Sequence, residues 1–357
     1  MTADSVQSRR LASRIEITKL ARELNADERS LGFLSRSSVA EIRDLRAAVT
    51  AAMFSKHEDR VTRLASLSRM LPVPLTARIA KLALGPRLSA LVAGVMDPRE
   101  AARLATHLDE EFLTELALSL DPVRVAPIVR ALPDSLVLAV GKRLLARGEH
   151  LTLGRFAAVV PLSVIEPLVA DATPRDLLYT ALYAEDQTAL EDVVKILPDE
   201  MLGKIIRSAA EENAYDAAVV ILASLSAESC GRLVAQVGAV EEHQLGTLIS
   251  AVAENEVWSS VLPGLHLVDQ EVLRVTANVP ETLNPHVLDD VIRTARDLGL
   301  APTLVQIVLA LDDDHVSMLK EVPSLMDPEV QEWILATAGV SRKLIHAVFA
   351  EVGLVDA

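Results

Sequence analysis

Hydrophobic residues recur every three or four positions along most of this chain, which is the spacing that predicts amphipathic α-helices. The pattern is most regular in residues 97–134, which read as three short helices placed one after another. In the first of these, Ala101, Leu104, Ala105 and Leu108 fall on one helical face. Helices of about eleven residues are marginally stable alone, so these segments are expected to stack on one another.

The starts of these helices have a recognisable signature. Asp97 suits the N-cap, Pro98 suits the first helical position, and Glu100 lies three residues after the cap. Starts of this kind recur at 24 to 28 residue intervals, at Asp97, Asp121, Glu149, Thr173, Pro198 and Ser226. If two helices make one unit, the sequence predicts an all-α superhelical array (an α-solenoid) of short helical hairpins with a degenerate period.

Three regions are expected. Residues 1–90 form a basic helical head whose first eight residues are predicted to be disordered. Residues 91–254 hold the regular hairpins, and residues 255–357 continue the array with looser repeats and a C-terminal capping helix. No stretch of the chain has the alternating pattern of a β-strand.

Composition narrows the class of protein. Half of the residues are hydrophobic but only 3% are aromatic, so aliphatic side chains are expected to build the core. No apolar run approaches the ~18 residues of a membrane span, and the N-terminus does not resemble a signal peptide. Cys230 is the single cysteine, which excludes an intrachain disulfide and indicates a small packing residue. The expected location is the cytoplasm, and the excess of arginine over lysine is compatible with a bacterial source.

Charge is unevenly distributed along the chain. Residues 1–90 carry 16 Lys and Arg against 9 Asp and Glu, a net charge of +7, whereas residues 91–357 carry 19 against 41, a net charge of −22. Two interpretations stay open: the basic head binds an anionic partner, or it packs against the rest of the chain or against another copy in an oligomer. The acidity of the array disfavours nucleic-acid binding.

Candidate partner-binding residues fall in two places. A basic amphipathic helix is predicted over residues 8–25, and its cations suit either a partner or a membrane surface, although an ordinary capping helix has the same pattern. Farther along, a few aromatic residues gather near an arginine, where they suit a partner segment or simple packing between helices. The candidates are Arg9, Arg10, Arg14, Lys19, Arg22, Arg155, Tyr179 and Tyr183.

Motifs for catalysis and cofactor binding are missing from the sequence. There is no phosphate-binding glycine loop, no HExxH and no GxSxG, and an S-x-x-K match at Ser317–Lys320 lacks its companion motifs. Asp312, Asp313 and Asp314 are the densest possible metal ligands, but this run lies where a helix is expected to begin. We therefore expect no catalytic residue, no cofactor and no metal, and interpret the three aspartates as a helix cap in a solvated loop.

The acid-capped helices resemble the superhelical cytoplasmic N domain of MgtE-type magnesium transporters, and more distantly the helical repeats of the flagellar switch protein FliG. The segments that carry the resemblance are DPREAARLATHL, DPVRVAPIVRALPD and ILPDEMLGKII, within residues 97–225. In the transporter family this domain precedes paired nucleotide-binding modules and membrane helices. We identify neither here, so the resemblance implies a fold and does not imply transport.

These observations predict a non-enzymatic interaction, scaffold or regulatory protein of the bacterial cytoplasm that binds a protein partner or forms a homo-oligomer. Two alternatives stay open. One is a peripheral membrane-associated regulator that binds through the basic N-terminal helix, and the other is an enzyme whose site has no recognisable motif.

Overall fold

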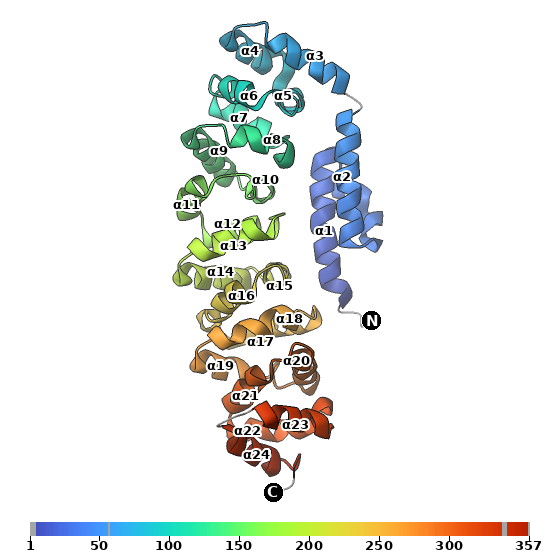
Figure 1. Cartoon of the computed structure of the whole chain (residues 1–357), viewed down its shortest axis with the longest axis vertical. Coiled ribbons are helices and arrows are strands. Elements are labelled where there is room, and N and C mark those ends of the chain that lie inside the picture. The colour runs from blue at the N-terminus through green and yellow to red at the C-terminus, as the bar shows by residue number, and fades with distance from the viewer. Residues whose placement is uncertain (1–4, 56–57, 338–340, 356–357) are drawn as a thin grey trace. The chain divides into compact units, whose positions relative to one another are not determined.

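The computed structural model describes residues 5–55, 58–337 and 341–355, and these ranges contain helices and no β-strand. The all-α prediction is confirmed (Figure 1). Contacts divide the chain into two compact units. Arg9–Ile196 is called the N-terminal unit, and Leu197–Ala357 makes up most of the C-terminal unit. The three regions predicted from the sequence, with boundaries near residues 90 and 254, stay a prediction.

The first three helices of the N-terminal unit, which from here on we call the head, cover only part of the predicted residues 1–90 and have a small hydrophobic core of their own. The head consists of α1 (Ser5–Leu24), η1 (Glu28–Arg36) and α2 (Val39–Ser55). Its core residues are Ile17, Leu20, Leu34 and Ile42, all nearly inaccessible to solvent. Since α1 begins at Ser5, residues 5–8 are helical and the prediction that they are disordered is wrong. Residues 1–4 lie outside the described residues.

The rest of the N-terminal unit is a stack of short helices. In chain order these are α3 (Glu58–Ser68), α4 (Val73–Ile79), η2 (Ala80–Leu84), α5 (Gly85–Ala93), α6 (Pro98–Ala105), α7 (Glu110–Ala117), α8 (Pro122–Val129), α9 (Asp134–Ala146), α10 (His150–Phe156), α11 (Leu162–Asp171), α12 (Pro174–Leu182) and α13 (Gln187–Ile196). Alternate helices contact one another, so that α3, α5, α7, α9, α11 and α13 form one row. A second row contains the pairs α4 with α6, α6 with α8, and α10 with α12 (Figure 1).

The predicted helix starts are confirmed. Each of the six residues named above directly precedes a helix, of which the first is α6 and the last is α16. Asp97 accepts hydrogen bonds from the backbone N–H groups of Arg99 and Glu100 at 3.0 and 3.2 Å. Thr173 and Asp176 form a reciprocal capping box. The aspartates thus satisfy backbone donors that a helix N-terminus leaves unpaired, while the repeat period itself stays a prediction.

The C-terminal unit continues with short helices. They are α14 (Asp199–Glu211), α15 (Tyr215–Leu222), α16 (Ala227–Val234), η3 (Val237–Ala239), α17 (Glu242–Glu254), α18 (Trp258–Val261), η4 (Leu262–Leu267), α19 (Gln270–Ala277), α20 (Pro285–Asp297), α21 (Ala301–Ala310), α22 (Asp313–Val316), η5 (Ser317–Glu321), η6 (Pro323–Met326), α23 (Pro328–Thr337) and α24 (Arg342–Glu351). Here α16 contacts α14 and α18, α15 contacts α17, and α21 contacts α19 and α23.

Two glycines allow a close helix crossing in this unit. A Cβ atom added to Gly231 in α16 would lie 2.5 Å from the carbonyl oxygen of Gly264 in η4. A Cβ atom added to Gly264 would lie 2.5 Å from the carbonyl oxygen of Ala227. Backbone therefore touches backbone, and neither position has room for a side chain. Cys230, next to this crossing, is fully buried.

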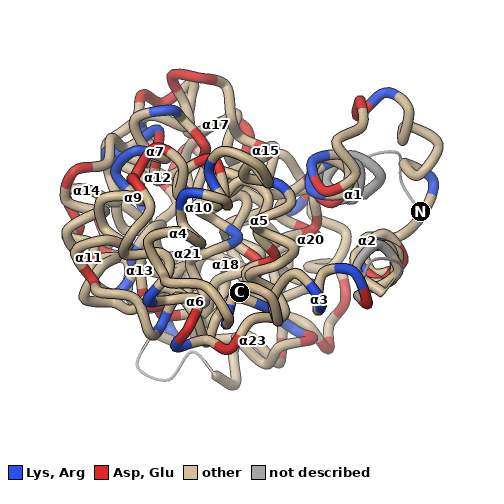
Figure 2. Tube along the Cα trace, turned by 90° about the horizontal axis from the view of Figure 1, so that it is seen from above, with Lys and Arg blue, Asp and Glu red and all other residues tan. Residues whose placement is uncertain are grey.

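Ion pairs between neighbouring layers follow a recurring pattern. A cation near the end of one helix meets an acid at the start of a helix in the adjacent layer, as with Arg143 and Glu110 at 2.9 Å, and with Arg232 and Asp199 at 2.6 Å. Figure 2 shows acidic and basic positions interspersed along the chain. A carboxylate stabilises the N-terminal end of a helix, and a cation stabilises its C-terminal end. Where the last turn of one helix lies beside the first turn of another, a cation and an acid therefore come together.

The acidic run at Asp312 also belongs to a helix start. Asp312 precedes α22 and pairs with Arg274 at 3.3 Å, while His315 contacts the amide oxygen of Asn278 at 2.9 Å. Within the described residues, no three His, Cys, Asp or Glu side chains gather as metal ligands. Among all the described residues, no helix has both the length and the apolar character needed to cross a bilayer.

Candidate functional site

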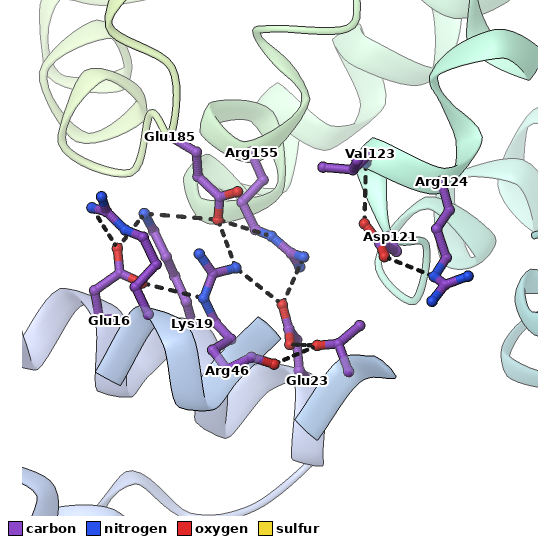
Figure 3. Close-up of polar contacts among 11 residues, drawn as sticks. Glu16, Lys19, Glu23, Arg46, Asp121, Val123, Arg124, Arg155 and Glu185 are labelled. Carbon is purple, nitrogen blue, oxygen red and sulfur yellow. Dashed lines mark hydrogen bonds and ion pairs between the residues drawn. The ribbon is translucent and has the colours of Figure 1, made fainter. Parts of the chain in front are cut away.

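An extensive buried charge network lies where the head meets the stack of the N-terminal unit. Six side chains form it, and we call them the head junction: Glu16, Lys19, Glu23, Arg46, Arg155 and Glu185 (Figure 3). Three are acids and three are cations, so their charges balance. The first four come from the head, and the last two come from α10 and from the segment after α12.

Helical spacing in α1 creates the head's side of this junction. Glu16, Lys19 and Glu23 follow one another at intervals of three and four residues, which places them on one face of the helix. Ile17 and Leu20 fall on a different face and pack into the core of the head. α1 therefore presents charged residues toward the stack and toward Arg46 of α2, and aliphatic residues toward the core of the head.

Arg46 of α2 links all three acids. Its Nε lies 3.2 Å from Glu16, and its Nη1 lies 3.2 Å from Glu23 and 2.9 Å from Glu185. Burial lowers the pKa of Arg46, but the three carboxylates outweigh this effect and raise it overall. Arg46 stays charged and acts as the central cation of the junction.

Arg155 is the cation that the stack contributes to the head junction. Its Nη2 lies 2.8 Å from Oε1 of Glu23, and its Nε lies 3.5 Å from Oε1 of Glu185. Gly154, the preceding residue, allows α10 to approach the end of α12, because a Cβ atom there would lie 2.6 Å from the carbonyl oxygen of Thr180. This close approach brings Arg155 and Glu185 to the same place.

Burial and neighbouring charges shift the pKa values of the junction. Burial lowers the pKa of Lys19, although Glu16 and Glu185 oppose this by favouring the ammonium ion. Burial raises the pKa of Glu16, but Lys19, Arg46 and Arg43 together lower it below its ordinary value. Lys19 and Glu16 are each only 2% exposed, so their charges depend on one another for compensation.

Aromatic residues of the stack lie beside the junction. The rings of His150 and Tyr179 stack with centroids 5.9 Å apart, and the guanidinium of Arg175 lies 5.3 Å from the centre of the Tyr179 ring. His150 also contacts Asp176 at 2.8 Å. Burial raises the pKa of Tyr183, and the charge of Glu28 in the head raises it further. The cap of α12 is thus joined to the aromatic residues beside it.

The structure gathers most of the residues predicted from the sequence. Lys19 and Arg155 lie in the junction, Arg22 pairs with Glu149 at 2.6 Å, and Tyr183 is half-buried next to the head. Tyr179 packs on His150, and Arg14 is exposed but lowers the pKa of Tyr183. The side chains of Arg9 and Arg10 lie outside the described residues. Partner binding by all of these residues stays a prediction.

Four junction residues were missed by the sequence reasoning, namely Glu16, Glu23, Arg46 and Glu185. The two acids of α1 had a signal, because they share a helical face with Lys19. Arg46 and Glu185 had none, since they reach the junction only through packing. The contacts of α1 and α2 with Arg155 and Glu185 agree with the interpretation in which the basic N-terminal region packs against the rest of the chain, and binding of an anionic partner or of another copy stays a prediction.

This arrangement is suited to holding a helix in place. Each of the three acids forms ion pairs with at least two cations. These ion pairs attract α1 and α2 to α10 and to the segment after α12. Comparisons of the chain with family models, with curated proteins and with solved structures find no match. The resemblance to the transporter N domain stays a prediction about fold.

Proposed function

We propose that this protein is a non-enzymatic scaffold of the bacterial cytoplasm, and that the face formed by α10 and α12 binds an amphipathic helix of a protein partner. One observation carries the proposal. This face already holds α1 through Arg155 and Glu185, which meet charges spaced along one side of that helix. A partner helix with a similar row of alternating charges fits the same contacts.

Exchange of one helix for another is energetically feasible at such a face. A buried and balanced ion network contributes little net stability compared with an apolar interface of the same size, because desolvation offsets much of the attraction. The head also keeps its own core of Ile17, Leu20, Leu34 and Ile42 when it leaves the stack. Binding of a partner therefore replaces the junction without unfolding the head.

The test is affinity purification from the native cell with mass spectrometry, comparing three variants with the wild type. Glu23→Arg places a cation beside Arg46 and Arg155, which releases the head and leaves the face intact. Arg155→Glu damages the face itself. Arg103→Glu changes an exposed arginine of α6 and serves as the control.

We expect Glu23→Arg to recover more of a reproducible partner, Arg155→Glu to recover less, and Arg103→Glu to match the wild type. Equal recovery from all four proteins, or no reproducible partner from a protein that is monomeric by light scattering, contradicts the proposal.

A further inference from the structure

A second surface, formed by the first helices of the stack, combines exposed aliphatic side chains with an excess of positive charge. Residues 58–96 contain six Lys and Arg and two Asp and Glu, a net charge of +4. We call the exposed aliphatic residues here the α3–α4 surface; they are Leu67, Met70, Leu71, Leu75, Ile79 and Leu82. Met70 is 80% exposed and Leu82 is 73% exposed, which is high for large apolar side chains.

In the helical segment formed by α4 and η2, two small side chains are buried and three large apolar side chains are exposed. This is the reverse of the arrangement that stabilises a protein without a partner. Ala77 and Ala80 are 4% and 5% exposed, so small side chains face the stack. Leu75, Ile79 and Leu82 recur at spacings of four and three residues and are directed outward. Burying such side chains away from water stabilises a protein, and here they are left exposed. Ala77 and Ala80 are buried while the larger Leu75, Ile79 and Leu82 are exposed, which is the pattern of a helix with a partner on its outer face.

The first helices of the stack lie at one end of its rows. α3 contacts α5, and α4 contacts α6 and η2, so within the described part of the N-terminal unit the layer formed by α3 and α4 has its main neighbouring layer on one side (Figure 1). Elsewhere in the stack a helix such as α7 contacts one helix before it and another after it in its row.

Contacts between neighbouring layers indicate which kinds of side chain would complement the α3–α4 surface. Lys81 of η2 pairs with Asp109 at the start of α7, and Arg69 pairs at 3.0 Å with Glu100 in the first turn of α6. Layers of the N-terminal unit contact one another through aliphatic side chains, and in each unit a cation meets an acid at a helix start, as with Arg143 and Glu110 and with Arg232 and Asp199. Arg60, Arg63 and Arg78 are exposed on or beside the α3–α4 surface.

We propose that the α3–α4 surface binds an amphipathic helix of a partner protein, with aliphatic residues along one face and acidic residues in its first turn. This inference rests on the proposed scaffold function and adds a second binding surface of different chemistry. A symmetric contact with a second copy would bring Arg60, Arg63 and Arg78 against identical residues, which is repulsive. Charge complementarity therefore selects an acidic helix.

The test measures fluorescence anisotropy of two synthetic helical peptides titrated with the full chain. The first peptide has leucine at spacings of four and three residues and glutamate elsewhere, and the second has lysine in place of glutamate. The variants are Leu82→Glu and Met70→Glu. Val123→Glu in α8 is the matched control, because Val123 is 77% exposed in the same unit.

We expect the acidic peptide to bind the wild type and Val123→Glu equally, and each of the two α3–α4 variants about tenfold more weakly. We expect the lysine peptide to bind the wild type about tenfold more weakly than the acidic peptide. Circular dichroism establishes that each variant is folded, and having two variants guards against misfolding of one.

Three results overturn the inference: equal binding of both peptides, unchanged binding by both variants, or no binding of the acidic peptide. Two further measurements assign the surface to another occupant and so also overturn it. One is co-sedimentation with phosphatidylglycerol vesicles that Leu82→Glu abolishes, and the other is a dimer in light scattering that Leu82→Glu dissociates. None of these outcomes changes the affinity purification that compares Glu23→Arg with Arg155→Glu. The scaffold proposal is therefore tested separately from this inference.

Discussion

Arg155 and Glu23, 132 residues apart in the sequence, lie in direct contact, with Nη2 of the arginine 2.8 Å from Oε1 of the glutamate. Both side chains are largely withdrawn from solvent. This pair connects the head, which has its own core, to a stack of short helices. The stability of that connection therefore depends on long-range charge contacts.

Removing Arg155 is expected to loosen the head. Arg155→Met leaves Glu23 and Glu185 with one cation fewer in a partly buried site, which costs about 3 kcal/mol for opening of the junction. Hydrogen exchange of the α1 amides measures this local opening. The double variant Arg155→Met with Glu23→Gln is expected to lose about 1 kcal/mol less than the sum of the single variants, because the two groups interact.

The control for this comparison is Arg103→Met, which changes an exposed arginine away from the junction. Unchanged exchange of α1 in Arg155→Met, or strict additivity in the double variant, would show that the pair does not hold the head.

The crossing of α16 and η4 is expected to tolerate no side chain. Gly231→Ala and Gly264→Ala each force two backbone segments apart, which should destabilise the C-terminal unit by about 1–3 kcal/mol. Gly238→Ala is the matched control in the same unit, since no atom lies within 4 Å of its added Cβ. Its effect should stay within about 0.5 kcal/mol. Thermal unfolding followed by circular dichroism compares the three, and an equal effect at all three positions would refute the close crossing.

Glu16 should make the head's stability depend on pH. Its pKa is lower in the folded protein than the ordinary value of 4.5, mainly because Lys19 and Arg46 outweigh its burial. The charge of Glu16 therefore stabilises the fold above about pH 4.5 and loses this effect as pH falls through the lowered pKa. Glu16→Gln should differ most from the wild type near pH 7, and the difference should shrink at acidic pH.

Urea denaturation followed by circular dichroism at a series of pH values measures this difference. Glu166→Gln changes an exposed glutamate of α11 in the same unit and serves as the control. A difference between Glu16→Gln and the wild type that stays constant down to acidic pH would argue against an ionic role for Glu16.

The cap of α6 offers a test of what the conspicuous aspartates do. Asp97→Ala removes an acceptor for two backbone N–H groups and should cost about 1 kcal/mol, whereas Asp97→Asn should keep most of the stability. Asp192→Ala, an exposed change within α13, should cost nothing because alanine favours helix. Urea denaturation distinguishes the three, and an equal loss for Asp97→Asn and Asp97→Ala would contradict the cap assignment.

Local features of the fold could be predicted from the sequence because they depend on neighbours along the chain. Helix starts at Asp97 and Thr173 require an acceptor side chain placed just before the first turn, and proline at the next position strengthens the signal. Residues 5–8 were the exception. Their polar composition suggested disorder, yet they continue α1.

The site was predicted in part. Lys19, Arg155 and Tyr183 were recognised as exceptional because cations and aromatic residues are informative in an aliphatic chain. Their contacts with one another could not be foreseen, because the position of α10 relative to α1 depends on the geometry of all the helices and turns between them. Glu185 was missed for the same reason, as a single acid in a loop has no distinguishing pattern.

The sequence by itself determined that the chain forms short, acid-capped helices with aliphatic faces, because capping and helical periodicity act within a few residues. The tertiary structure alone decided that the head folds on its own core and meets the stack through balanced charges. It also decided that, in the segment formed by α4 and η2, Ala77 and Ala80 are buried while Leu75 and Leu82 are exposed. Both are questions of which face of a helix meets which neighbour, and the free energy of that choice comes from burial and ion pairing between residues distant in sequence.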